Sequence, residues 1–126
     1  MDTLMLDEHL AAGWYLVESD SATRYALRWG QGRLHMVRIT GPGTHGRAWW
    51  DDQVVPLLGI WSISGDGAEP LPGMVRVGCR HRWLADPEGT FGESDWWWLQ
   101  RTCTGFRKVG EAEMARLRAG TAGGDA

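Results

Sequence analysis

Short segments of alternating apolar and polar residues, separated by glycine-containing turns, constrain the fold of this chain more than any other feature. The clearest is residues 24–29, in which Tyr25 and Leu27 share one face. An alternation of period two places every second side chain on the same side of a β-strand. The Gly-Gln-Gly segment at 30–32 follows at once, and glycine supplies the positive φ that a short hairpin needs. The sequence therefore predicts a hairpin that continues into a strand over 33–40.

The same reasoning predicts strands along the rest of the chain, with the most regular alternation over 74–83. A strand before the hairpin completes a three-stranded meander. An exposed connection is expected at 64–73, and one or two helical turns over 6–13. The remaining predicted strands are 14–18, 57–63, 95–102 and a short piece at 106–109.

Residues 111–118 have a helical pattern, with acidic residues in the first turn and arginines in the last. Met114 and Leu117 are spaced to dock this helix on the sheet. Short strands at regular spacing without a long crossover helix are typical of antiparallel architectures. The fold class predicted is mostly β: a small antiparallel barrel or sandwich of five to seven strands with a short C-terminal helix.

The chain length of 126 residues predicts one domain, over 1–120, followed by a flexible tail at 121–126. A chain of this size buries a core without metals or disulfides. The apolar fraction of 43% and the charged fraction of 23% are those of globular proteins and exclude wholesale disorder.

Charge and hydropathy exclude two classes of partner. The net charge of −3 argues against bulk nucleic-acid binding. No run approaches the roughly 18 apolar residues of a membrane span, and the acidic start is unlike a signal peptide, so a cytoplasmic location is expected. Arginine almost replaces lysine and asparagine is absent, which indicates a GC-rich bacterial genome, such as that of an actinobacterium.

The two cysteines, Cys79 and Cys103, do not form a disulfide framework or a zinc-ligand spacing. Free thiols are expected in a reducing compartment. The four histidines are scattered, so the sequence predicts neither a metal site nor a cofactor.

Nine tryptophans exceed the number that one core of this size requires. If 74–84 and 95–102 pair as a hairpin with Leu84 opposite Asp95, three cross-strand pairs follow. Trp83 then faces Trp96 and His81 faces Trp98 on one side, whereas Arg82 faces Trp97 on the other. The same register places Cys79 opposite Gln100.

The tryptophan cluster has two main interpretations. In the first, the rings fill the interior and Trp97 lies outside under a cation–π contact with Arg82. In the second, the rings line a pocket in which polar groups orient a ligand. A third, a flat platform for stacking sugars or bases, stays open. The predicted pocket residues are Trp29, Trp61, Trp83, Trp96 and Trp98, with Arg80 and His81 as the polar groups.

Arginines at 76, 80 and 82 form a comb that suits a carboxylate or phosphate, or else a solvated strand face. The catalytic candidates are His81, beside aromatic residues, and Asp51, in an acidic pair after two tryptophans. No nucleophile elbow, P-loop or dinucleotide fingerprint is present, and no motif identifies a family.

These observations favour a non-catalytic binding domain for an apolar or planar small molecule, or for the hydrophobic side chains of a partner. One alternative is a small-barrel cyclase or isomerase of natural-product metabolism that works by positioning its substrate, with His81 or Asp51 moving a proton. The other is an interaction or inhibitor module in which exposed Trp49, Trp50 and Trp97 are anchors.

Overall fold

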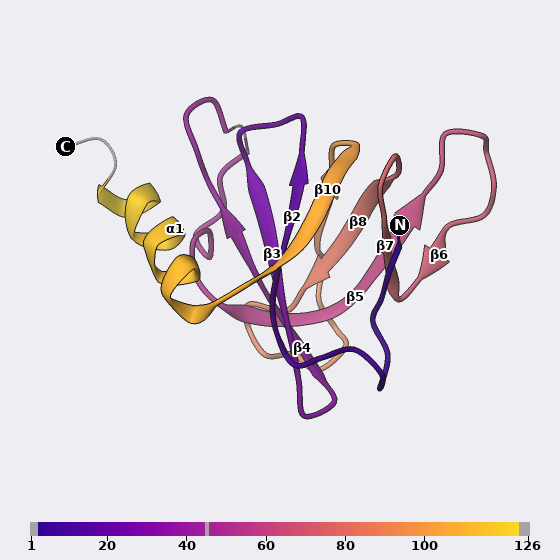
Figure 1. Ribbon diagram of the computed structural model, residues 1–126, viewed down its shortest axis with the longest axis horizontal. Coiled ribbons are helices and arrows are strands. Elements are labelled where there is room, and N and C mark those ends of the chain that lie inside the picture. Colours follow the sequence, from indigo (N-terminus) through magenta and orange to yellow (C-terminus); the bar gives the residue numbers. More distant parts are fainter. Residues whose placement is uncertain (1–2, 45, 124–126) are drawn as a thin grey trace.

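Ten strands and one helix form the part of the chain that the computed structural model describes, residues 3–44 and 46–123 (Figure 1). The fold is therefore mostly β with one C-terminal helix, as predicted. The strands are β1 Thr3–Met5, β2 Gly13–Ser19, β3 Arg24–Gly30, β4 Arg33–Ile39, β5 Val55–Ile63, β6 Leu71–Pro72, β7 Met74–Arg76, β8 Arg80–Ala85, β9 Trp96–Gln100 and β10 Cys103–Val109, and the helix is α1 Glu111–Gly123.

The main sheet is antiparallel and has the order β10-β2-β3-β4-β5-β8-β9, with β6 beside β5. The predicted meander of β2, β3 and β4 is confirmed. Strand β5 joins the two halves of the sheet, because its first residues pair with β4 and the rest pair with β8. Figure 1 shows the resulting curvature. Within the described residues no ladder joins β9 to β10, so the sheet does not close into a barrel.

The single strand predicted over 74–83 is wrong, because the chain turns at Gly78 with φ of +90°. Strand β7 leaves the main sheet and pairs with β1, and β8 begins after the turn. Val77 is exposed in this turn. The alternation of side chains continued through the turn by coincidence, whereas the glycine marked the break.

The two ends of the described chain also differ from prediction. Residues 6–12 form turns and bends rather than helix, and Tyr15 Oη donates to the Ala11 carbonyl oxygen at 2.6 Å. Helix α1 continues past residue 118 to Gly123, so it includes 121–123 of the predicted tail, and residues 124–126 lie outside the described residues.

The two faces of the β2–β4 meander bury two separate clusters. The helix-side core, which includes Trp14, Leu16 and Val37, is covered by Met114 and Leu117 of α1 as predicted. The inner core lies on the inside of the curved sheet and is the larger cluster. Its members include Tyr25, Leu27, Met36, Trp50, Ile60 and Trp83.

Candidate functional site

The β8–β9 hairpin carries Trp83 and the three consecutive tryptophans at 96–98, and its register differs from the predicted one by two residues. Leu84 lies opposite Trp97 rather than Asp95, and Trp83 lies opposite Trp98 rather than Trp96. His81 therefore faces Gln100 instead of Trp98, and Arg82 faces Leu99 instead of Trp97. A shift of two preserves the side of the sheet on which each residue lies, because the side-chain period is also two.

Trp83 is wholly buried in the inner core. Its ring stacks on Tyr25 with centroids 5.0 Å apart, and its Nε1 donates to Gln100 Oε1 at 3.0 Å. Gln100 Nε2 in turn donates to the Val17 carbonyl oxygen at 3.2 Å, which ties β9 to β2 across the curve. This ring is thus held by packing and a complete hydrogen bond.

Trp50 is fully buried, so the expectation that it is exposed is wrong. It lies in the turn after residue 47 and makes edge contacts with Trp96 and Trp98, with centroids 6.1 and 6.2 Å apart. A turn has no side-chain period, and for that reason the sequence did not indicate which tryptophan of the 49–50 pair faces inward. Trp49 is 59% exposed.

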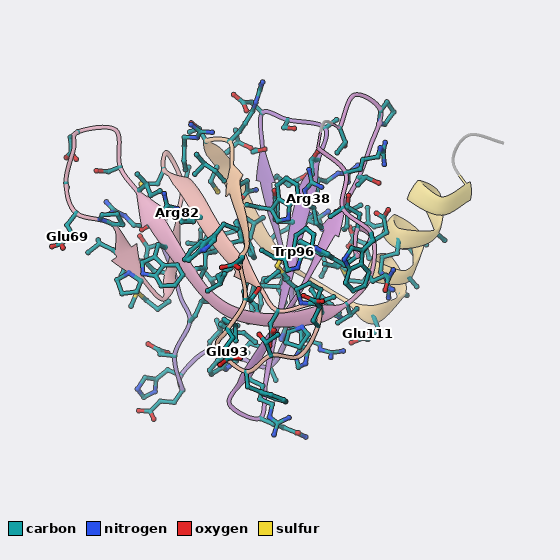
Figure 2. All side chains as sticks on the ribbon, turned by 180° about the vertical axis from the view of Figure 1, so that it is seen from behind. Arg38, Glu69, Arg82, Glu93, Trp96 and Glu111 are labelled. Atoms are coloured by element: carbon teal, nitrogen blue, oxygen red, sulfur yellow. The ribbon has the colours of Figure 1, made fainter. Side chains whose placement is uncertain are left out.

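A buried ion pair that the sequence analysis missed lies beside the inner core, between Arg38 and Asp51. Arg38 Nη1 lies 2.9 Å from both carboxylate oxygens of Asp51, and the two side chains are only 4% and 7% exposed. The guanidinium also lies 4.0 Å from the centroid of the Trp98 ring and donates to Tyr25 Oη at 3.3 Å. An arginine at an inward position of a strand was the available signal. Figure 2 shows Arg38 and Trp96 inside the curve of the sheet.

The two catalytic candidates, His81 and Asp51, line neither of the two pockets described below. His81 is fully buried, and its Nε2 accepts the Arg76 amide at 2.9 Å while Nδ1 has no partner in the described structure. Burial, aided by the charge of Arg76, lowers the pKa of His81 to about 4. The Asp51 carboxylate is paired with the Arg38 guanidinium. The structure thus gives both groups a place in the folded interior.

The outer face of β5, β8 and β9 carries a second group of rings. Trp61 and Trp97 lie with centroids 5.4 Å apart and planes tilted by 46°. Arg82 lies 5.4 Å from the centroid of the Trp97 ring, so the predicted cation–π contact on the outside is confirmed. Trp97 is 45% exposed.

These rings form one wall of a groove of about 350 Å³, here called the outer groove. Its lining residues are Trp61, Ile63, Glu69, Pro70, Arg82 and Trp97. Figure 2 shows Arg82 and Glu69 on the same side of the molecule, away from the helix. Gly59 makes room for one ring, because a Cβ built there would lie 2.5 Å from Trp61 Cη2.

A second depression of about 500 Å³, here called the rim pocket, lies where the β2–β3 turn approaches the end of β9. It has a more polar lining than the outer groove and includes Trp98, Arg38 and Arg80. Trp98 Nε1 is buried and has no partner among the described residues.

The predicted ligand residues are therefore dispersed over several places. Trp61 lines the outer groove, whereas Arg80 and Trp98 line the rim pocket. His81 and Trp83 belong to the interior, and Trp96 packs partly buried against it. Trp29 lies at the end of β3, opposite Gly13 and Leu34, and lines neither pocket.

Both cysteine thiols are free and buried. Cys79 lies beside Cys103 rather than opposite Gln100, because the Cys103 amide donates to the Cys79 carbonyl oxygen at 2.8 Å. This placement corrects the predicted register at that end of the hairpin. In residues 3–44 and 46–123, no three His, Cys, Asp or Glu side chains gather as metal ligands. No helix within that part of the chain has the length and apolar character to cross a membrane.

Comparison of the chain with protein-family models, with curated proteins and with solved structures gives no match. The site must therefore be interpreted from its own chemistry.

Proposed function

We propose that this protein is a non-catalytic binding domain that holds a planar, apolar small molecule in the outer groove. The observation that carries the proposal is the pair of neighbouring rings, Trp61 and Trp97, on a solvent-facing wall. A tryptophan at an exposed position leaves apolar surface in contact with water. Where such surface is gathered in one patch on a monomer, it often marks a binding site. In this proposal the curved sheet acts as an incomplete barrel whose outer wall is the site.

The dimensions and chemistry of the groove support a small planar ligand. Its volume of about 350 Å³ lies within the range of small-molecule sites, which are mostly apolar with a few polar groups that fix orientation. Arg82 and Glu69 are the polar groups here, and their opposite charges favour a neutral ligand over a strongly charged one. The two rings offer stacking contacts, worth about 0.5–1.5 kcal/mol each beyond the area they bury.

A titration with the uncharged naphthalene dye Prodan tests the proposal. We expect saturable binding with a blue-shifted emission, and an affinity about ten-fold weaker in Trp97→Ala. Trp49→Ala is the matched control, because it removes another exposed ring that lines neither pocket, and it is expected to leave the affinity unchanged. Absence of saturable binding, or an equal loss in both variants, overturns the proposal.

A hydrophobic segment of a partner protein is the second candidate for the same groove. Leu99 is 45% exposed on β9, the strand of Trp97, and Leu71 is 40% exposed on β6, beside β5, which extends the apolar surface beyond a small ligand. Native mass spectrometry of protein purified gently from its own cells separates the two candidates. A stoichiometric excess of a few hundred daltons supports the small molecule, and a second chain supports the partner.

A further inference from the structure

The rim pocket differs from the outer groove in its place and in its chemistry, and the two share no lining residue. Its walls come from the β2–β3 turn, from β4 and the loop that follows, and from the adjoining ends of β8 and β9. These segments are distant in sequence, and the curvature of the sheet brings them together. The volume of about 500 Å³ is sufficient for a small molecule.

The pocket has an excess of positive charge. Among the described lining residues, Arg38 is neutralised by buried Asp51, which leaves Arg80 and Arg101 against the single acid Asp20. Arg101 Nη1 lies 4.0 Å from Asp20 Oδ1, and both side chains are more than half exposed, so this ion pair is weak. The partner of Arg80 is a backbone carbonyl rather than an acid, because its Nε donates to the Gln100 main-chain oxygen at 3.3 Å.

Two serines add neutral donors to this wall: Ser19, the last residue of β2, and Ser21, in the turn that follows. Ser19 Oγ accepts the Ser21 amide at 3.1 Å, and Ser21 Oγ accepts the Thr23 amide at 3.2 Å. A hydroxyl has one proton to donate besides its acceptor sites. Neither hydroxyl donates a hydrogen bond within the described structure, so both protons are available to a group in the pocket.

We propose that the rim pocket binds the anionic group of a small molecule, a phosphate or a carboxylate. Arg80 and Arg101 pair with the oxyanion, and the hydroxyls of Ser19 and Ser21 donate to it. Hydrogen bonds from a guanidinium to an oxyanion are charge-assisted and are among the stronger polar contacts in proteins. The Trp98 ring, which also lines the pocket, is the apolar wall for the remainder of the ligand.

The test is a titration of the ¹⁵N-labelled protein with inorganic phosphate and, separately, with acetate, followed by NMR at constant ionic strength set with chloride. We expect saturable shifts of the Arg80 and Arg101 Nε–H signals and of the Ser21 amide. Saturation by phosphate alone identifies a phosphorylated ligand, saturation by acetate alone identifies a carboxylate, and either result supports an anion site.

Variants separate a specific site from a general effect of charge. Arg80→Gln combined with Arg101→Gln should weaken binding at least about ten-fold, whereas Arg33→Gln combined with Arg116→Gln removes the same charge from exposed positions outside the pocket and should not. Ser21→Ala retains every charge and is expected to weaken binding by a smaller factor.

No saturation by either anion, or an equal loss in both double variants, overturns the proposal. Trp97→Ala leaves the rim pocket intact, so failure of Prodan binding and failure of anion binding are independent results.

Discussion

The two faces of the β8–β9 hairpin use the same residue type in opposite ways. Trp96, Trp97 and Trp98 are consecutive, yet the first and third face the inner core and the second faces solvent. The inward rings contact Trp50, whereas Trp97 contacts Trp61 and Arg82 on the exposed wall. The number of tryptophans therefore does not by itself indicate a binding site. Their side of the strand decides whether they stabilise the fold or remain available to a ligand.

Replacing one ring on each face gives the largest expected difference. Trp83→Ala should destabilise the protein by about 5 kcal/mol, because it leaves a cavity and removes the partner of buried Gln100. Trp97→Ala should cost less than about 1 kcal/mol, because that ring is 45% exposed. Urea unfolding of both variants measures the two values, and similar values would show that the two faces are not distinct.

The buried ion pair is the next most sensitive feature of the inner side. Asp51→Ala should cost about 3–4 kcal/mol, because it leaves the Arg38 guanidinium buried without its carboxylate. Replacing both partners, by Arg38→Met and Asp51→Leu, should recover a large part of that loss. Urea unfolding of Asp51→Ala and of the double variant measures the recovery. If the double variant is less stable than Asp51→Ala, the pair is not the reason for the loss.

The pH dependence of stability sharpens the comparison further, because His81 is buried on the inner side of this hairpin. Burial lowers the pKa of His81 to about 4 in the folded state, against the usual 6.5 in the unfolded chain. The unfolded state therefore binds the proton first, and stability falls as the pH drops below 6.5 until it levels off near 4. The loss should total about 3 kcal/mol.

Denaturant titrations between pH 7 and pH 4 measure this loss. His81→Gln should flatten the profile. His35→Gln should remove a smaller part of the slope, because partial burial and nearby Arg28 and Arg33 also lower the pKa of His35. A profile that His81→Gln leaves unchanged would assign the slope to other groups.

The sequence predicted the sides of the strands better than their registers. Alternation placed His81 and Trp83 on one face and Arg82 on the other, and this held although the pairing moved by two residues. The register depends on contacts across the curve, such as that from Gln100 to the Val17 carbonyl, which no local pattern contains. The break at Gly78 had a local signal instead, because the turn follows the glycine rather than the period.

The pockets were less predictable than the strands. The rim pocket combines residues 17 to 80 positions apart, such as Ser21 with Arg38 and Arg101, so its lining depends on the curvature of the sheet. Burial of Trp50 depends on a turn between β4 and β5 that has no period. Arg82 over Trp97 was predictable, because both lie on the outward side of adjacent strands.

A small effect on stability is also expected under the outer groove, at Gly59. A methyl group there would meet the end of the Trp61 ring, with Cη2 at 2.5 Å and Cζ3 at 2.7 Å. The ring is the far end of a side chain, so it can rotate away, and Gly59→Ala should cost about 1 kcal/mol or less. Rotation nevertheless separates Trp61 from Trp97, so Prodan affinity should fall several-fold.

Gly65→Ala is the matched control, because a Cβ at that position meets no atom within 4 Å. Stability is measured by urea unfolding and affinity by the Prodan titration for both variants. A loss of affinity in Gly59→Ala without a comparable loss of stability would show that the arrangement of the two rings, and not only their presence, forms the groove. Unchanged affinity in Gly59→Ala would instead mean that Trp97 binds without Trp61, and the outer wall would then be a single-ring contact rather than a groove.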